Sequence, residues 1–355
     1  MINLITPIDC YTGYGITGYN IWKNLYKLDN ELALFLLHQP NLEAEWNAKD
    51  IRQCVTNQIN FNPDSPCFKL WHAHELFLKT CGNSKYGALS FFEIDHCSKL
   101  ETIGYNLLDI IFMPSTWAKT VLENNGIKKP IVVCPQGVDT SIFNASIPTT
   151  DKDDSKYVFI NIGKWEIRKG HDILIDMFNA AFEHTDNVEL WMINHNGFLN
   201  SEKNAEWAKF YTGSKLGDKV RIFPRLPTQQ HLAKAMSYAD CGLFPSRAEG
   251  WNNEAIELFA MNKPIIITDY SAHTEYCNKD NAYLINVDKI TPANDGIWFK
   301  GEGNWALIGD EQIEQTIEHM RFVYKNNIRT NLNGLLTARH YSWDKTAKII
   351  YDNML

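Results

Sequence analysis

Short apolar runs alternate with amphipathic stretches along almost the whole chain. Runs with the length and apolar content of buried strands lie, in the first half, at residues 2–7, 32–38, 67–73, 87–93, 110–115 and 131–137. In the second half they lie at residues 156–164, 188–194, 220–225, 241–246, 264–269 and 282–287. Strands that alternate regularly with helices are typical of parallel sheets covered by helices. We therefore expect an α/β protein.

Helical spacing fills several of the intervals between these runs. It predicts helices over residues 16–28, 116–125, 171–182 and 254–261, and a last helical stretch that holds Tyr341, Trp343 and Tyr351. The pattern stops and restarts once, because the polar segment NASIPTTDKDDSK at 144–156 has neither strand nor helix character. Such a segment is the most plausible domain boundary.

The restart predicts two doubly wound, Rossmann-like domains that face one another across a ligand cleft. A chain of 355 residues also exceeds the size that one hydrophobic core usually serves. We expect an N-terminal domain over residues 1–145 and a C-terminal domain over 146–335. Residues 336–355 are expected to form a helix that packs back toward the N-terminal domain.

Composition and charge narrow the class of function. The net charge of −8 argues against a nucleic-acid binder, which would carry a basic stripe, and against membrane attachment through a polybasic face. The chain starts without a basic segment followed by a long apolar run, and no apolar segment reaches the roughly 18–20 residues that cross a bilayer. Eight cysteines without close spacing suit reduced thiols. Together these features predict a cytoplasmic protein.

The stretch SRAEGWNNEAIELFAMNKPIIITDY, residues 246–270, places two carboxylates on either side of a helix start. Glu249 lies in a turn that follows a strand, and Glu257 lies in an apolar helix, where Glu is a poor choice unless it binds something polar. The carboxyl ends of parallel strands and the helix starts beside them collect anionic ligands, here at Asn252 and Asn253. Carboxylates accept hydrogen bonds from hydroxyls. A diphosphate between polyhydroxy rings, as in a nucleoside diphosphate sugar, satisfies both requirements.

A diphosphate also requires cations. The segment GKWEIRKGHDIL, residues 163–174, connects a predicted strand to a predicted helix in the same half of the chain. Lys164 and Lys169 lie in this connection, where both ammonium groups could reach one pyrophosphate. Gly170 would help the backbone turn into the helix.

These residues together carry a family resemblance. The combination of G-K-x4-K-G, then E-G-x6-E before an apolar helix and KPIIITD, is similar to the retaining glycosyltransferases of family 4. The segments at 114–143 and 218–246 also resemble that family, and the likeness spans about residues 1–300. It implies the GT-B fold and a metal-independent hexosyltransferase that moves a hexose from a nucleoside diphosphate sugar to a glycan or another hydroxyl acceptor. No cofactor is implied.

The resemblance also implies roles for residues. Lys164 and Lys169 would neutralise the departing diphosphate, Glu249 would contact hydroxyls of the transferred sugar, and Glu257 would hold the nucleotide ribose. The remaining residues expected to bind the donor are Gly163, Gly250, Trp251, Asn252 and Asn253. The glycine turn at 11–20 would pass close to the phosphates and the acceptor, with Gly13 and Gly15 permitting the approach.

The acceptor side is less defined by the sequence. Glu93, Asp95 and His96 follow a predicted strand at the place where the family carries a loop that faces the reaction centre, so they are candidates for orienting the acceptor. His72 and His74 lack a third ligand at suitable spacing, and we expect no metal. Two alternatives stay open: a sugar-nucleotide epimerase or hydrolase on the same fold, and a non-catalytic module that binds sugar nucleotides.

Overall fold

The computed structural model describes residues 2–78 and 80–355, and the chain divides into two compact units. Unit 1 comprises Met1–Val138 and Tyr341–Leu355, and unit 2 comprises Asp139–His340. The last segment of the chain therefore returns to the unit that its first segment builds. Each unit is described separately below.

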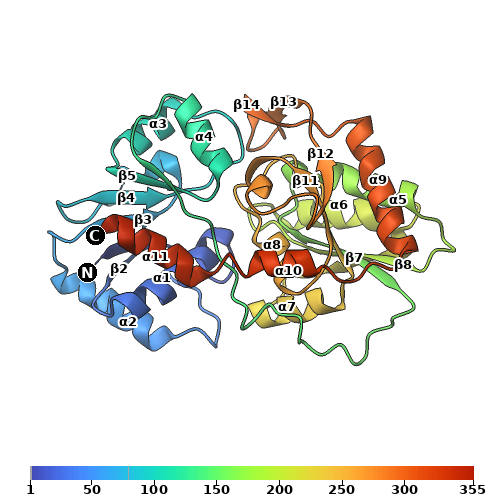
Figure 1. Cartoon of the computed structure of the whole chain (residues 1–355), viewed down its shortest axis with the longest axis horizontal. Helices are drawn as coiled ribbons and strands as arrows, with labels where there is room; N and C mark the ends of the chain where they lie inside the picture. Colours follow the sequence, from blue (N-terminus) through green and yellow to red (C-terminus); the bar gives the residue numbers. More distant parts are fainter. Residues whose placement is uncertain (1, 79) are drawn as a thin grey trace. The chain divides into compact units, whose positions relative to one another are not determined.

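Unit 1 is built on a six-stranded sheet in which every neighbouring pair is parallel (Figure 1). The strand order is β2-β1-β3-β4-β5-β6, so the direction of winding reverses between β1 and β3. The strands are β1 (Asn3–Thr6), β2 (Ala33–Leu36), β3 (Cys67–Leu70), β4 (Tyr86–Leu89), β5 (Ile110–Met113) and β6 (Ile131–Val133). Its helices are α1 (Gly13–Leu28), α2 (Ala48–Asn57), α3 (Lys99–Asn106), α4 (Thr116–Asn124) and α11 (Trp343–Met354).

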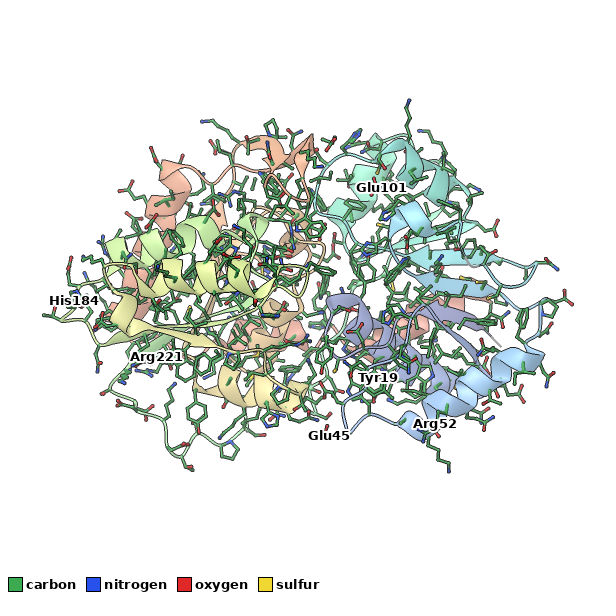
Figure 2. The ribbon with its side chains drawn as sticks, turned by 180° about the vertical axis from the view of Figure 1, so that it is seen from behind. Tyr19, Glu45, Arg52, Glu101, His184 and Arg221 are labelled. Atoms are coloured by element: carbon green, nitrogen blue, oxygen red, sulfur yellow. The ribbon has the colours of Figure 1, made fainter. Side chains whose placement is uncertain are left out.

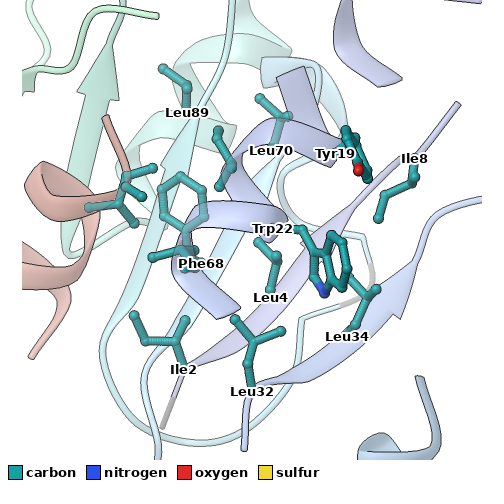
Figure 3. Packing of buried hydrophobic residues seen from close by; sticks show 14 of the residues in the cluster. Ile2, Leu4, Ile8, Tyr19, Trp22, Leu32, Leu34, Phe68, Leu70 and Leu89 are labelled. Carbon is teal, nitrogen blue, oxygen red and sulfur yellow. The ribbon is translucent and has the colours of Figure 1, made fainter. Parts of the chain in front are cut away.

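Both faces of the first sheet are buried, which explains why its strands are apolar at nearly every position. Successive side chains of β5 point to opposite faces, so Phe112 joins one hydrophobic cluster while Ile111 and Met113 join another. The cluster that contains Phe112 also holds Trp22 of α1 and Leu34 of β2 (Figure 3). Side chains from three elements, two strands and a helix, thus form one core.

Helix α11 completes that core, and it lies against α1 (Figure 1). Trp343, Ile350 and Met354 belong to the same cluster as Trp22. The hydroxyl of Thr346 donates to the carbonyl of Pro135 at 2.7 Å, which ties the helix to the segment that follows β6. The final residues are therefore part of the folded unit 1.

Unit 2 repeats the architecture of unit 1 with a second six-stranded parallel sheet. The strand order is β12-β11-β10-β7-β8-β9, and the winding reverses between β7 and β10. The strands are β7 (Tyr157–Gly163), β8 (Val188–Asn194), β9 (Val220–Phe223), β10 (Cys241–Phe244), β11 (Ile265–Asp269) and β12 (Tyr283–Asn286). Its helices are α5 (His171–Ala181), α6 (Ser201–Thr212), α7 (Gln229–Tyr238), α8 (Asn253–Ala260), α9 (Asp310–Lys325) and α10 (Leu332–Ala338).

Each run that the sequence predicts as a strand overlaps one of these twelve strands, and each predicted helix overlaps a helix. The expectation of an α/β fold with two Rossmann-like, parallel-sheet domains is confirmed. The prediction was incomplete for helices, because it did not include α2, α3, α6, α7, α9 and α10. It also missed an antiparallel hairpin of β13 (Ile290–Asn294) and β14 (Lys300–Ala306). Half of its positions are exposed and β14 contains two glycines, so neither apolar content nor alternation marked it. Across the described part of the chain, no helix combines the length and apolar character that a membrane span requires.

Asp240, directly before β10, is a buried carboxylate that links several segments of unit 2. Its buried carboxylate accepts from the backbone N–H of Val158 at 2.9 Å and from the Arg329 guanidinium at 2.8 Å, and it is paired with the Lys152 ammonium. The side chains of Lys152 and Arg329 are themselves only 10% and 22% exposed. The carboxylate therefore fixes the start of β7 and is the shared counter-charge of two cations that water reaches poorly.

We predict that Asp240→Asn lowers the free energy of unfolding of unit 2 by about 3 kcal/mol, because two poorly solvated cations lose their shared counter-charge. Urea denaturation followed by tryptophan fluorescence measures this change. The matched control is Asp153→Asn, whose side chain is 57% exposed, and we expect it to change the free energy by less than about 0.5 kcal/mol. Equal stability of the two variants would contradict the anchoring role.

Candidate active site

The predicted donor-site residues of unit 2 gather where its sheet changes winding direction. Lys164 and Lys169 follow β7, and Glu249 follows β10, the strand that neighbours β7. In open parallel sheets this position at the carboxyl ends of the strands is where ligands bind. Sequence reasoning placed both loops at strand ends, and the strand order makes them adjacent.

Two glycines allow the loops to approach one another. Gly170 has φ +77°, and a Cβ there would lie 2.3 Å from the carbonyl oxygen of Pro245. Gly163 has φ +147°, and the stem of Lys169 passes over it, 3.0 Å from the place of a Cβ. The backbone N–H of Arg247 donates to the carbonyl of Arg168 at 2.6 Å and joins the loops directly.

A buried charge network lies between the loops. The Glu249 carboxylate receives the Lys169 ammonium at 2.7 Å and the Arg168 guanidinium at 2.7 Å. Arg168 also pairs with Glu166 at 2.7 Å, and Glu166 pairs with Lys164 at 2.9 Å. Lys164, with 45% of its side chain exposed, is the most accessible of these five groups.

The charged groups of the network shift one another's pKa values. Burial alone would raise the pKa of Glu249, but Arg168 and Lys169 outweigh this effect and hold that pKa well below its usual value. Burial likewise disfavours the Lys169 ammonium, yet the Glu249 carboxylate raises the pKa of Lys169 above its ordinary value. The carboxylate and both cations are therefore charged at neutral pH, and together they present a net positive charge.

Glu257, eight residues after Glu249, has the opposite environment. It lies on α8 among buried residues, and within the described chain it forms no ion pair. Burial raises its pKa well above the usual value, and the nearby Glu254 adds to this effect. A buried carboxyl group without a counter-ion is unfavourable in the protein alone, so this position suits a ligand that supplies hydroxyl groups.

Hydrogen bonds and packing inside unit 2 hold the turn between Glu249 and Glu257. Asn252 has φ +79°, accepts from the N–H of Ala255 at 3.3 Å, and points its amide nitrogen at Nε2 of His273, 3.0 Å away.

Trp251 is 3% exposed, and its ring packs against that of Tyr276 with the ring centres 5.0 Å apart, so it is used for packing. Of the other predicted donor-site residues, Gly250 is buried beside Glu249, and Asn253 begins α8 with a buried side-chain oxygen that has no hydrogen-bond partner among the described residues.

Two buried histidines that sequence reasoning missed support the loops. His273 lies 2.9 Å from the carbonyl of Thr268 through Nδ1, so Nδ1 carries the proton and Nε2 accepts from Asn252. His171 accepts the backbone N–H of Glu166 at Nδ1, and its Nε2 donates to Asn161 at 2.9 Å. Burial lowers the pKa of His273 to about 4 and that of His171 to about 3. Both rings are neutral at pH 7.

Sequence reasoning also missed the roles of Glu166 and Arg168. Both stand in the same short run as Lys164 and Lys169, but spacing alone does not tell which of two adjacent cations turns inward. Arg247, two residues before Glu249, forms a bidentate pair with Asp172 at 2.8 Å. Its guanidinium is therefore a structural clamp between the loops.

The predicted acceptor-side residues lie in unit 1, at the carboxyl ends of β1 and β4. Gly13 is the first residue of α1 and has open space around it, whereas a Cβ at Gly15 would lie 2.2 Å from the Asp9 carboxylate. Glu93 and Asp95 are half-buried and His96 is exposed in the segment that follows β4.

Tyr14 of α1 links these two segments, because its hydroxyl accepts the N–H of Phe91 at 3.1 Å. Burial raises the pKa of Tyr14, and Glu93 adds to the effect.

Among the residues that the structure describes, no three His, Cys, Asp or Glu side chains gather as a set of metal ligands. His72 and His74 stack on one another with ring centres 5.5 Å apart. Nucleophile and base pairs of the Ser-His kind were not predicted, and the buried histidines found here are each engaged by backbone or amide groups. The charged groups of the site are therefore those of the network around Glu249, and the buried carboxyl group of Glu257 lies apart from them without a counter-ion among the described residues.

The neutral histidines predict a pH dependence of stability. In the unfolded chain a histidine takes up a proton below about pH 6.5, whereas His273 in the folded chain does so only near pH 4. Its contribution to stability is therefore complete above pH 6.5 and is lost as the pH falls toward 4. Between pH 7 and pH 5 we expect His273 to account for a loss of about 2 kcal/mol in the free energy of unfolding.

Comparison of the wild type with His273→Gln at both pH values measures this contribution. The variant should lose about 2 kcal/mol less than the wild type on acidification. Glu257, whose raised pKa acts in the opposite direction, is common to both proteins and cancels in the difference. His184→Gln is the matched control, because His184 lies at the surface with 60% of its side chain exposed (Figure 2). Identical pH profiles for wild type and His273→Gln would overturn the assignment.

Comparisons with known proteins agree with this geometry. Residues 156–295, which include Lys164, Glu249 and Glu257, match the family model described as glycosyl transferases group 1. A curated relative, an uncharacterised glycosyltransferase of Methanocaldococcus jannaschii, is 25% identical over 175 residues. That match covers 46% of this chain and 41% of the relative, so the chain spans less than half the length of the curated relative.

Solved structures resemble the whole chain. Sucrose-phosphate synthase from Thermosynechococcus elongatus superposes with a TM-score of 0.71 at 13% identity, covering 99% of this chain and 97% of that one. HepE of Anabaena, solved in complex with UDP and glucose, superposes with a TM-score of 0.69 at 13% identity, covering 99% and 98%. These likenesses show the fold. Taken together, the comparisons show the GT-B fold, in which residues 156–295 match the family model of glycosyl transferases group 1.

Proposed function

We propose that this protein is a retaining, metal-independent glycosyltransferase that moves a hexose from a nucleoside diphosphate sugar to a glycan or another hydroxyl acceptor. The observation that carries the proposal is the pair of carboxyl groups in opposite states at the switch point of unit 2. Glu249 is ionised and paired with two cations, whereas Glu257 is buried without a counter-ion. This arrangement suits a ligand that joins a diphosphate to hydroxyl-bearing rings.

The cations of the network would stabilise the leaving group. As the bond between C1 of the sugar and the diphosphate oxygen breaks, its electron pair passes to the diphosphate, and negative charge develops there. Lys169 is held in place by Glu249, and Lys164 is accessible at the edge of the network. Fixed charges of this kind stabilise a transition state without reorganising during the reaction. The proposal assigns the neutralisation of the diphosphate to these side chains, so the reaction needs no divalent ion.

The two glutamates would bind the hydroxyl groups of the donor. Glu249 accepts from the transferred sugar while staying paired with Arg168, and Glu257 binds the nucleotide ribose. Gly163, Gly250, Asn252 and Asn253 shape the loops around the donor, and Trp251 braces them from the buried side. HepE of Anabaena has been solved with UDP-glucose, which makes UDP-hexoses the first donors to test.

The acceptor hydroxyl would attack C1 on the face from which the diphosphate leaves, and its proton would pass to the departing diphosphate. This front-face substitution keeps the configuration at C1 and needs no covalent nucleophile. We assign acceptor orientation to unit 1, where Glu93, Asp95 and His96 follow β4 and the start of α1, with Gly13 and Gly15, follows β1. Carboxylates at such positions accept the hydrogen bond of a hydroxyl group.

We predict different kinetic signatures for Lys169→Ala and Glu257→Ala. Loss of Lys169 removes charge that acts mainly in the transition state, so kcat should fall about 100-fold while the donor dissociation constant changes less than about threefold. Loss of Glu257 removes ground-state binding, so the donor dissociation constant should rise about tenfold. Calorimetry measures binding, and nucleotide release measures turnover.

The matched control is Lys209→Ala, which removes an exposed lysine of α6 and should leave both constants unchanged. Thermal melts of all three variants report whether they fold. Full turnover in Lys169→Ala would remove the leaving-group argument. Unaltered donor affinity in Glu257→Ala would show that this carboxyl group does not bind the donor.

A panel of UDP-, GDP- and ADP-sugars, each with and without oligosaccharide acceptors, tests the function itself. We expect nucleotide release that depends on the acceptor, at the same rate with and without EDTA, and a product whose anomeric configuration by NMR equals that of the donor. Isomerised donor without acceptor would indicate an epimerase, and release without acceptor a hydrolase. Binding without any turnover would indicate a sugar-nucleotide-binding module.

A further inference from the structure

Two cysteines of unit 1 that are distant from each other in sequence lie in direct contact. The Sγ of Cys81 donates to the Sγ of Cys67 at a distance of 3.2 Å. All eight cysteines are free thiols in the structure. Cys67 is 2% exposed, whereas Cys81 is only half-buried. One residue of the pair is therefore partly exposed, and the other is buried.

Strand register and backbone hydrogen bonds bring the two cysteines together. Cys67 begins β3 and is aligned with Tyr86 of β4, so the connection between the two strands must return to the level of Cys67. The N–H of Cys67 donates to the carbonyl of Lys85 at 2.9 Å, and the N–H of Asn83 donates to the carbonyl of Pro63 at 2.8 Å. Backbone hydrogen bonds of the residues that follow Cys81 thus hold it beside Cys67.

The surroundings favour the thiolate form at one of the two sulfurs. The hydrogen bond from Cys81 lowers the pKa of Cys67 in spite of burial, and the ammonium group of Lys69 adds to the effect. The same hydrogen bond raises the pKa of Cys81. Lys69 is held in place by the carbonyl of Glu75 at 2.8 Å and by that of Leu78. The two thiols are therefore unequal, and Cys67, beside the Lys69 ammonium, is the one whose ionisation the surroundings favour.

We propose that Cys67 and Cys81 are a reversible thiol–disulfide modification site, oxidised by a low-molecular-weight disulfide such as glutathione disulfide. The sulfurs need to approach by about 1 Å to reach disulfide bonding distance. The proposal rests on this contact and its exposure, and it is independent of the glycosyl transfer proposed above.

The exchange balances as two successive displacements. Cys81, the less buried residue of the pair, gives up its proton as its sulfur attacks one sulfur of glutathione disulfide. This step forms a mixed disulfide and releases one glutathione thiolate, which takes up that proton. The Cys67 thiolate then attacks the Cys81 sulfur, which forms the Cys67–Cys81 bond and releases the second glutathione. The protons that leave the two protein thiols are taken up by the two glutathione thiolates. The protein loses two electrons, and glutathione disulfide gains them.

The bond would close the connection between β3 and β4 into a covalent loop. That connection begins with Trp71 and His72, whose rings contact Tyr14 of the glycine turn at 5.5 and 4.6 Å. Oxidation therefore restrains a segment that packs against the predicted acceptor side of unit 1. Because a disulfide restricts the unfolded chain, the oxidised protein should also be the more stable form.

The test uses the full chain, reduced and then equilibrated with glutathione disulfide. Remaining thiols are alkylated in denaturant and counted by intact mass. We expect six alkylated cysteines after oxidation, two fewer than the eight in the sequence. Peptide mapping should find Cys67 linked to Cys81, dithiothreitol should restore eight thiols, and the melting temperature should be higher by about 5 °C in the oxidised form.

Variants make the assignment specific. Cys67→Ser and Cys81→Ser should each keep all seven remaining thiols against the same oxidant, apart from a mixed disulfide with glutathione. Cys97→Ser, the matched control, should fall from seven thiols to five. Eight thiols in the oxidised wild type, a linkage between other cysteines, or a bond that forms only in the denatured chain would each overturn the proposal. These outcomes do not depend on whether the protein transfers sugars.

Discussion

The pairing of the Glu249 carboxylate with Arg168 and Lys169 is the interaction on which the candidate site depends. It joins the loop that follows β7 to the loop that follows β10, at the point where the sheet of unit 2 reverses its winding. Removing any one charge would leave its partners poorly solvated, which is far more costly than leaving the network intact. The close approach at Gly170 and the clamp of Arg247 on Asp172 hold the geometry in which these short contacts form.

The same geometry separates two carboxyl groups that belong to one short stretch of sequence. Glu249 stays ionised because cations surround it, whereas Glu257 lies on an apolar helix with only another carboxyl group, that of Glu254, nearby. The first therefore organises cations within the protein, and the second is left to bind a group that comes from outside. A ligand with a charged centre and neutral hydroxyl groups at its ends fits both, which is why the chemistry points to a sugar nucleotide.

Rigid, uncharged supports lie behind this charged layer. His171 and His273 remain neutral because burial disfavours their protonation, and each fixes a loop through hydrogen bonds at both ring nitrogens. Asn252 links one of these rings to the start of α8. The charged side chains of the site are thus positioned by groups that do not titrate near neutral pH. Charges held in this way need little rearrangement when a diphosphate binds.

The sequence by itself determined the twelve strands, the α/β class and the two-domain organisation, because strands buried on both faces must be continuous apolar runs. It also located Lys164, Lys169, Glu249 and Glu257 at strand ends and a helix start. Only the tertiary structure decided which of these charges pair. The inward turn of Arg168, the support by His171 and His273, the exposed hairpin β13–β14 and the contact of Cys67 with Cys81 all depend on strand order and on backbone contacts between distant segments. Local sequence patterns indicate which residues are buried, but they do not indicate which buried residues contact one another.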